Sequence, residues 1–161
     1  MTATDRVARA VFALLVAACF AAFFVTQRLK HTPTAVQMFK MTPFFSPSSS
    51  RLINQERISF RLARSDEVTV TVVNSAGSEV ATLTREVPVT GYKQFSLRWN
   101  GRTGTAHRFV HLVSENGHRT IVPINEGRRA PPGEYRVRVY LRHSAREVLS
   151  PWSFTLLGGG G

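Results

Sequence analysis

Apolar and polar residues alternate with a period of two through much of the chain beyond residue 43. The clearest stretch follows the run Pro131-Pro132-Gly133, which forms turns readily because proline fixes φ and glycine tolerates positive φ. The two faces of this stretch consist of Tyr135, Val137, Val139 and Leu141 on one side and Arg136, Arg138, Tyr140 and Arg142 on the other. This period predicts a β-strand with one buried face and one solvated, cationic face.

The same alternation recurs in short segments separated by turn residues. These segments cover residues 58–62, 68–72, 95–99 and 152–156, and a return strand is expected from Glu79 to Leu83. Turn chemistry occurs at residues 74–77 and at Asn100-Gly101. Short strands without a convincing soluble helix predict an all-β sandwich of two antiparallel sheets over residues 44–157.

A different pattern fills the N-terminal part, where residues 10–25 form an unbroken apolar run. Sixteen helical residues span about 24 Å, slightly less than the roughly 30 Å hydrocarbon core of a bilayer. We therefore expect a short tail at residues 1–9 and a single transmembrane helix at residues 10–27. A juxtamembrane linker is expected at residues 28–43, although its apolar residues would also suit a first strand.

Within the apolar run, Ala13, Ala17 and Ala21 recur every four residues, a spacing that lets membrane helices pack closely. Chance alone produces such spacings in an alanine-rich segment. Val16-Ala17-Ala18-Cys19 also resembles a bacterial lipobox, so a lipoprotein anchored at Cys19 is an alternative. Against it, the apolar run continues for six residues beyond Cys19. Basic residues flank both ends of the run, so the orientation rests on the prior that a short N-terminal tail stays inside the cell.

Residues 102–130 form an insertion within the β region. Asn116-Gly117 is a strong hairpin signal, and the expected arms are Phe109 to Ser114 and His118 to Ile124. We predict that this hairpin either binds a partner or simply extends a sheet.

The net charge of +11 suggests a ligand for the insertion, because basic residues can recognise anionic lipid or an anionic wall polymer. The candidate binding residues are Arg102, Arg108, Arg119, Arg128 and Arg129. The alternative is that these arginines only occupy the solvent-exposed faces of strands and bind nothing. No finger spacing, basic helix or RNP pattern accompanies the charge, so nucleic acid is not an expected partner.

Catalytic chemistry has little support in the sequence. His107, His111 and His118 could approach one another on the hairpin, but no Cys or Asp joins them, so no metal site is expected. The chain shows no phosphate loop, nucleophile elbow or matched pair of carboxylates. We expect neither enzyme activity nor a cofactor.

Several segments together resemble the FlgD-type immunoglobulin-like domain, a module of bacterial hook-capping and cell-surface proteins. They are Phe45-Ser46-Pro47, residues 58–62, residues 68–80, Trp99-Asn100-Gly101-Arg102 and Pro131-Pro132-Gly133-Glu134-Tyr135. The signature residues are Trp99, Gly101, Pro132, Gly133 and Tyr135. The resemblance covers roughly residues 44–157 and implies an Ig-like sandwich outside the cytoplasm that serves attachment rather than catalysis. The turn at residues 48–51 lacks the carboxylates that would suit calcium in this family.

These observations lead to one functional expectation. The chain is expected to be a bitopic bacterial membrane protein whose external Ig-like domain acts as a non-catalytic accessory or scaffold subunit. Its partners would be membrane lipid and a membrane or envelope protein. The alternative is a recognition module for an anionic cell-wall glycopolymer. Residues 158–161 are expected to form only a glycine tail.

Overall fold

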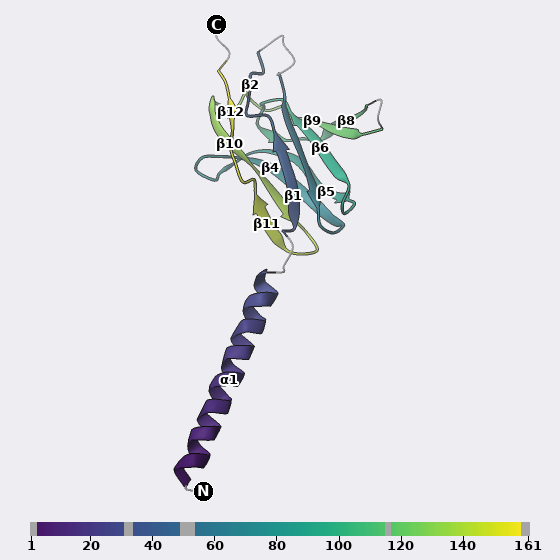
Figure 1. Cartoon of the computed structure of the whole chain (residues 1–161). Coiled ribbons are helices and arrows are strands. Elements are labelled where there is room, and N and C mark those ends of the chain that lie inside the picture. Colours follow the sequence, from purple (N-terminus) through teal and green to yellow (C-terminus); the bar gives the residue numbers. More distant parts are fainter. Residues whose placement is uncertain (1–2, 31–33, 49–53, 115–116, 159–161) are drawn as a thin grey trace. The chain divides into compact units, whose positions relative to one another are not determined.

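The computed structural model describes residues 3–30, 34–48, 54–114 and 117–158, with side chains described over residues 11–25 of the first range. The chain divides into two compact units, which we call the helical unit (residues 1–34) and the β unit (residues 35–161). Figure 1 shows the helix of the first unit and the strands of the second. The turn at residues 49–51 and the tail at residues 159–161 lie outside the described residues.

The helical unit consists of α1, Ala3–Lys30. The segment contains neither Gly nor Pro and is rich in Ala, Leu and Phe, so nothing in it interrupts helical hydrogen bonding. The span expected at residues 10–27 lies within this helix. Searched over the described residues, the structure contains no helix that combines the length and the apolarity needed to cross a membrane.

In its described residues the β unit forms two sheets. The five-stranded sheet has the order β1 (Val36–Met41), β3 (Glu56–Leu62), β6 (Gln94–Trp99), β9 (Arg119–Ile124) and β8 (Arg108–Val113). The seven-stranded sheet has the order β2 (Phe44–Phe45), β12 (Phe154–Leu156), β10 (Gly133–Leu141), β4 (Asp66–Asn74), β5 (Glu79–Val89) and β7 (Gly104–Thr105), and β11 (Arg146–Leu149) pairs with β10.

The alternating pattern decides which side chains are buried. On β10 the predicted apolar residues Tyr135, Val137, Val139 and Leu141 are all at most 4% exposed. They join apolar residues of β3, β4 and β6 in one hydrophobic cluster that both sheets share. The coarse prediction of a β-rich fold with two sheets is therefore confirmed, and the arrangement is compatible with a sandwich.

Three strand pairs differ from the antiparallel expectation. β2 pairs with β12, β5 with β7, and β6 with β9, all in parallel orientation. Two of these pairs use strands of only two residues that run beside a longer neighbour. The third arises because the chain passes through β7 and β8 before β9 returns beside β6, and such a long connection permits parallel pairing.

The segment expected as a linker at residues 28–43 contains a strand. Residues 36–41 form β1 at the edge of the five-stranded sheet, and Phe39 packs on Phe60 with ring centroids 5.4 Å apart. Burial of Phe39 and Val36 supplies the reason, because both complete the core cluster. Of the two neighbouring phenylalanines, Phe45 is fully buried, whereas Phe44 is 48% exposed because adjacent strand residues point to opposite faces.

Two further expectations need correction. The return strand continues beyond Leu83 to Val89, where it pairs with the start of β4. Trp152 was expected to share the apolar face of the last strand, but β12 begins only at Phe154 and the indole is 54% exposed.

Candidate binding surfaces

An aromatic cluster around Trp99 holds the signature residues in place. The fully buried Trp99 ring makes edge contacts with Phe45, Tyr135 and Phe154 at centroid distances of 5.6, 5.5 and 6.0 Å. Its indole Nε1 donates a hydrogen bond to the carbonyl oxygen of Arg102 at 2.8 Å. Trp99 thereby joins the core to the loop that begins the insertion.

The remaining signature residues shape the turns. Gly101 has φ of +75°, and a Cβ there would lie 2.6 Å from Cγ of Pro47, so only glycine fits without displacement. Gly133 has φ of +153° next to the exposed Pro132. The Tyr135 hydroxyl donates to the carbonyl oxygen of Pro131 at 2.5 Å. These contacts give the signature residues a structural role.

The five candidate arginines divide into two groups. Arg102 and Arg129 form an isolated β-bridge, and Arg128 adjoins them. Arg102 Nη1 donates to the carbonyl oxygen of Gly127 at 3.1 Å, and Arg129 Nη1 donates to Ser48 Oγ at 2.9 Å. Arg108 and Arg119 lie at opposite ends of the hairpin, where they pair with Ile124 and Val113.

The β8–β9 hairpin has arms close to those predicted. Ser114 and His118 close its turn through a backbone hydrogen bond of 3.0 Å from Ser114 N to His118 O. All six residues of β8 are exposed, and they include Phe109, Val110, Leu112 and Val113. Because β8 ends the order of its sheet, one of its backbone edges has no strand beside it among the described residues.

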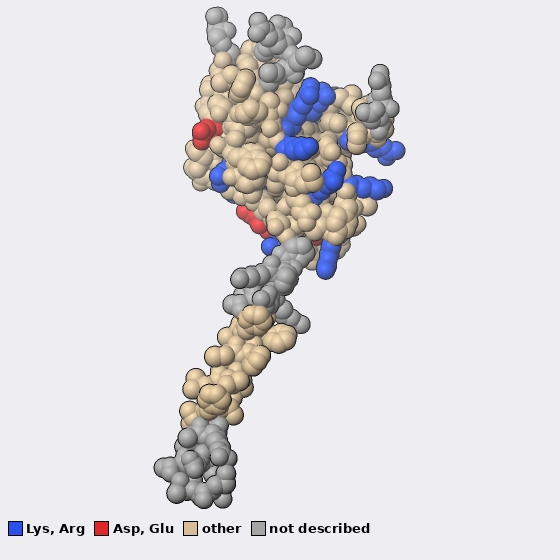
Figure 2. Space-filling model, viewed as in Figure 1, with Lys and Arg blue, Asp and Glu red and all other residues tan. Residues whose placement is uncertain are grey.

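Four basic residues occupy the outward side of β1, β3 and β6 in the five-stranded sheet, a grouping that was not predicted from the sequence. They are Lys40 on β1, Arg57 and Arg61 on β3, and Arg98 on β6, each alternating with residues of the core. In Figure 2, Lys and Arg lie over the front of the β unit, where Figure 1 places β1 and β6, and Asp and Glu are visible only toward its left and lower margins. The period-2 pattern of β3 and β6 was the available signal, but it does not reveal which strands are neighbours.

A buried carboxyl lies on the inward side of the same sheet. Glu56 is 0% exposed and sits opposite Trp99 in the strand register. Its Oε1 accepts a hydrogen bond from Thr42 N at 2.7 Å, whereas Oε2 has no partner within the part of the chain that the structure describes. Burial raises the pKa of Glu56 to about 8, although the hydrogen bond from Thr42 opposes this change.

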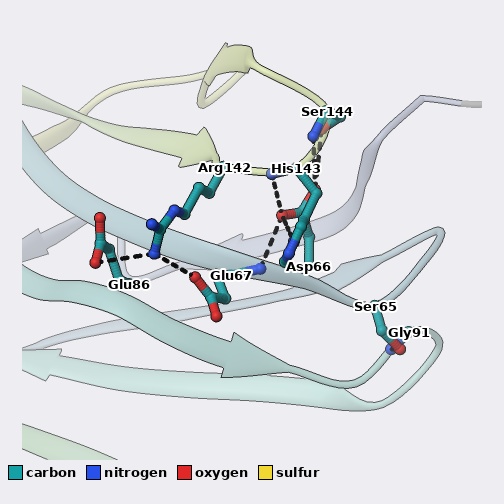
Figure 3. A network of polar contacts seen from close by, with 8 residues as sticks. All are labelled: Ser65, Asp66, Glu67, Glu86, Gly91, Arg142, His143 and Ser144. Atoms are coloured by element: carbon teal, nitrogen blue, oxygen red, sulfur yellow. Dashed lines mark hydrogen bonds and ion pairs between the residues drawn. The ribbon is translucent and has the colours of Figure 1, made fainter.

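Figure 3 shows a polar network that joins the start of β4 to the turn between β10 and β11. Asp66 Oδ1 accepts from His143 N at 2.8 Å, and Asp66 Oδ2 accepts from the Ser144 hydroxyl at 3.0 Å. Arg142 forms ion pairs with Glu67 at 2.8 Å and Glu86 at 3.1 Å. Desolvation acts to raise the pKa of Asp66, but its hydrogen bonds with His143 and Ser144 lower it overall.

We expect Asp66→Asn to destabilise the β unit by about 1–3 kcal/mol, since the neutral side chain loses charge-assisted hydrogen bonds to the turn. Because the native carboxyl has a lowered pKa, its contribution is present near neutral pH and is lost as pH falls through the native pKa. Urea unfolding at neutral and acidic pH checks this prediction. Glu134→Gln at an exposed position is the control. A cost for Asp66→Asn that stayed the same at both pH values would contradict the charge-based explanation.

The remaining candidates are placed as follows. Ala13, Ala17 and Ala21 lie on α1 and are exposed, and Cys19 is an exposed free thiol. Among the described residues, no group of three or more His, Cys, Asp or Glu side chains could hold a metal ion. His111 pairs with Ile121 in the hairpin register, and His118 follows the turn.

No family model matches the sequence, and no curated protein is significantly similar to it.

Proposed function

We propose that the chain is a non-catalytic accessory or scaffold subunit that α1 tethers to a bacterial membrane and whose β unit binds a partner in a membrane or envelope assembly. The observation that carries the proposal is the exposure of every large apolar side chain between Val11 and Val25 on α1. Such a surface is unfavourable in water and requires lipid or protein to cover it.

The length of the apolar run is compatible with a tether. Residues 10–25 alone are a few ångströms short of a typical hydrocarbon core, and a bilayer accommodates a small mismatch by local thinning. The helical backbone continues on both sides, from Ala3 to Lys30, so flanking residues add length. By the usual rule for a short N-terminal tail, we place the β unit outside the cytoplasm.

For the β unit we propose the FlgD-type Ig-like fold, on the basis of its signature residues. The β8–β9 hairpin is the proposed partner-binding element because its outer strand is exposed and apolar along most of its length. A strand of a partner protein could pair with the open edge of β8, and Phe109, His111 and Val113 would provide side-chain contacts on one face.

We expect the double variant Leu15→Arg/Phe20→Arg to lose most of its membrane retention, because each arginine at the centre of a helix opposes insertion by about 2.5–3.5 kcal/mol. The measurement is the distribution of the full chain between carbonate-washed membranes and the soluble fraction. The control is Tyr92→Arg/Trp152→Arg, which places the same charges on exposed positions of the β unit outside the hairpin. Equal retention of both double variants would refute the tether.

Two alternatives have specific support. Recognition of an anionic wall polymer is favoured by the basic residues on the five-stranded sheet. In that case the only contacts would be those between these cations and the negative charges of the polymer. A lipoprotein anchored at Cys19 is favoured by the Val16-Ala17-Ala18-Cys19 motif, and intact mass decides it, since lipidation there follows removal of the first 18 residues.

A further inference from the structure

We propose that the outward side of the five-stranded sheet docks on the surface of an anionic lipid bilayer. This surface, which we call the basic face, consists of the outward-pointing residues of β1, β3, β6, β9 and β8. The inference rests on the proposed tether and goes beyond it, because it assigns a ligand to a surface that is distinct from the helix.

The strand register brings the cations of the basic face together. Arg57 on β3 lies directly opposite Arg98 on β6, and Arg61 lies further along β3, opposite Gln94. Lys40 on β1 lies opposite Ser59, between the two arginines of β3. Like charges at directly opposite positions destabilise a sheet, so folding alone does not favour the Arg57–Arg98 pair. An anionic ligand placed over the pair would relieve this repulsion.

Among the described residues, the acidic side chains of the β unit come from positions outside the basic face. None of the described outward-pointing positions of the basic face is Asp or Glu. Asp66, Glu67 and Glu86 belong to the polar network of Figure 3. Glu126 pairs with Arg108, and Glu147 with Arg138. Arg108 on β8 also points outward, but it is paired with Glu126. The other four cations of the basic face form no ion pair among the described residues, so their charge is available for an external anion.

An apolar strip continues the basic face across the hairpin. Thr120 of β9 is the register partner of Ser96 on β6 and of Leu112 on β8, so all three point outward together. Val110 precedes Leu112 on the same side of β8, and the two side chains are 45% and 39% exposed. A bilayer surface can bind both the cations and the apolar strip, because its phosphates pair with the cations and the apolar layer beneath the headgroups covers the strip. A polyanion in water pairs with the cations but leaves the apolar strip exposed.

The connection to the helix keeps the β unit within reach of headgroups. Only residues 31–35 separate the end of α1 at Lys30 from the start of β1 at Val36. A chain of that length spans at most about 20 Å when fully extended. If α1 is inserted, the β unit is confined beside the bilayer and even a weak surface interaction is populated.

The test uses the full chain in nanodiscs of phosphatidylcholine alone or mixed with phosphatidylglycerol. A fluorophore is attached at Ser96→Cys, on the basic face, or at Ser75→Cys, in the turn after β4, with Cys19→Ala in both proteins. Lipids with a spin label on the headgroup quench a fluorophore that lies at the surface. We expect strong quenching at position 96 in the anionic discs and little quenching in neutral discs or at position 75.

Charge variants give the matched control. Arg57→Gln/Arg98→Gln should lower the ratio of docked to undocked protein roughly 30-fold, on the basis of the usual contribution of a basic residue near an anionic surface. Arg85→Gln/Arg136→Gln removes the same charge from exposed positions on the seven-stranded sheet and should leave quenching unchanged. Equal effects of the two double variants would overturn the proposal.

The outcomes separate this proposal from the tether. If the chain remains in the discs but position 96 is not quenched, the docking surface is refuted and the tether stands. If the chain elutes without the discs, both fail. Binding of heparin that depends on Arg57 and Arg98, without quenching in anionic discs, would refute bilayer docking in favour of polymer recognition.

Discussion

Glu56→Gln is expected to remove most of the loss of stability that the native protein shows as pH rises from 4.5 to about 8. The pKa of the buried carboxyl is about 8 in the folded chain, against an ordinary value of 4.5. A raised carboxyl pKa means that the folded state binds the proton more tightly than the unfolded state does. The contribution of Glu56 is therefore most favourable below pH 4.5, declines as pH rises toward 8, and is constant above that.

Between pH 6 and pH 9 the unfolding free energy of the native protein should fall by about 3 kcal/mol on account of Glu56, since each pKa unit corresponds to about 1.4 kcal/mol. The amide of the Glu56→Gln variant cannot ionise, so the variant should be more stable than the native protein at pH 9 and similar to it at acidic pH. Urea unfolding in mild detergent, followed by circular dichroism, measures both. Glu134→Gln, at an exposed residue, should follow the native curve. Parallel curves for the native protein and Glu56→Gln would refute the raised pKa.

Trp99→Ala is expected to destabilise the β unit by about 3–5 kcal/mol. The change removes a fully buried ring from contact with three aromatic neighbours and leaves a cavity between the sheets. It also removes the indole hydrogen bond to the carbonyl oxygen of Arg102.

The sequence offers a matched control at Trp152, which is 54% exposed. Trp152→Ala should change stability by no more than about 0.5 kcal/mol, because surface substitutions away from special features rarely cost more. The urea midpoint of each variant, measured by circular dichroism, provides the comparison. A similar loss from both variants would mean that the cluster around Trp99 does not organise the core.

The fold was largely predictable wherever one face of a strand is buried. On β10, β4 and β3, period-2 alternation identified the buried residues, because a buried face requires apolar side chains at every second position. Pairing was less predictable. The parallel contacts of β2, β7 and β9 depend on the path of the chain between strands, and alternation carries no information about that path.

Prediction from the sequence also failed at two places where the residue types are unusual for a strand of the core. Residues 36–41 were interpreted as linker because prolines flank the segment at Pro33 and Pro43. In the structure the pairing of β1 is irregular between Gln37 and Lys40, where Met38 has φ of +52°. Glu56 continues the inward face that Ile58 and Phe60 define, so the period is consistent with its burial. The predicted strand began only at Ile58, because a charged side chain is not expected in a core.

The candidate site was predicted only in part. The sequence identified the hairpin and its arms, because Asn116-Gly117 is a local signal. The basic face was not predicted, since Arg57 and Arg98 are far apart in the sequence and become neighbours only through the pairing of β3 with β6. The candidate arginines chosen by position in the insertion lie at separate places, and Arg108 is already paired with Glu126.

The central claim is that the apolar helix lies in a bilayer, and the single cysteine of the chain tests it directly. Cys19 lies in the apolar run and is an exposed thiol in the structure. In native membranes a water-soluble, membrane-impermeant maleimide should not label Cys19 until the membrane is dissolved in SDS. A cysteine introduced at Ser75 should label under both conditions. Immediate labelling of Cys19 in intact membranes, equal to that in SDS, would contradict the account.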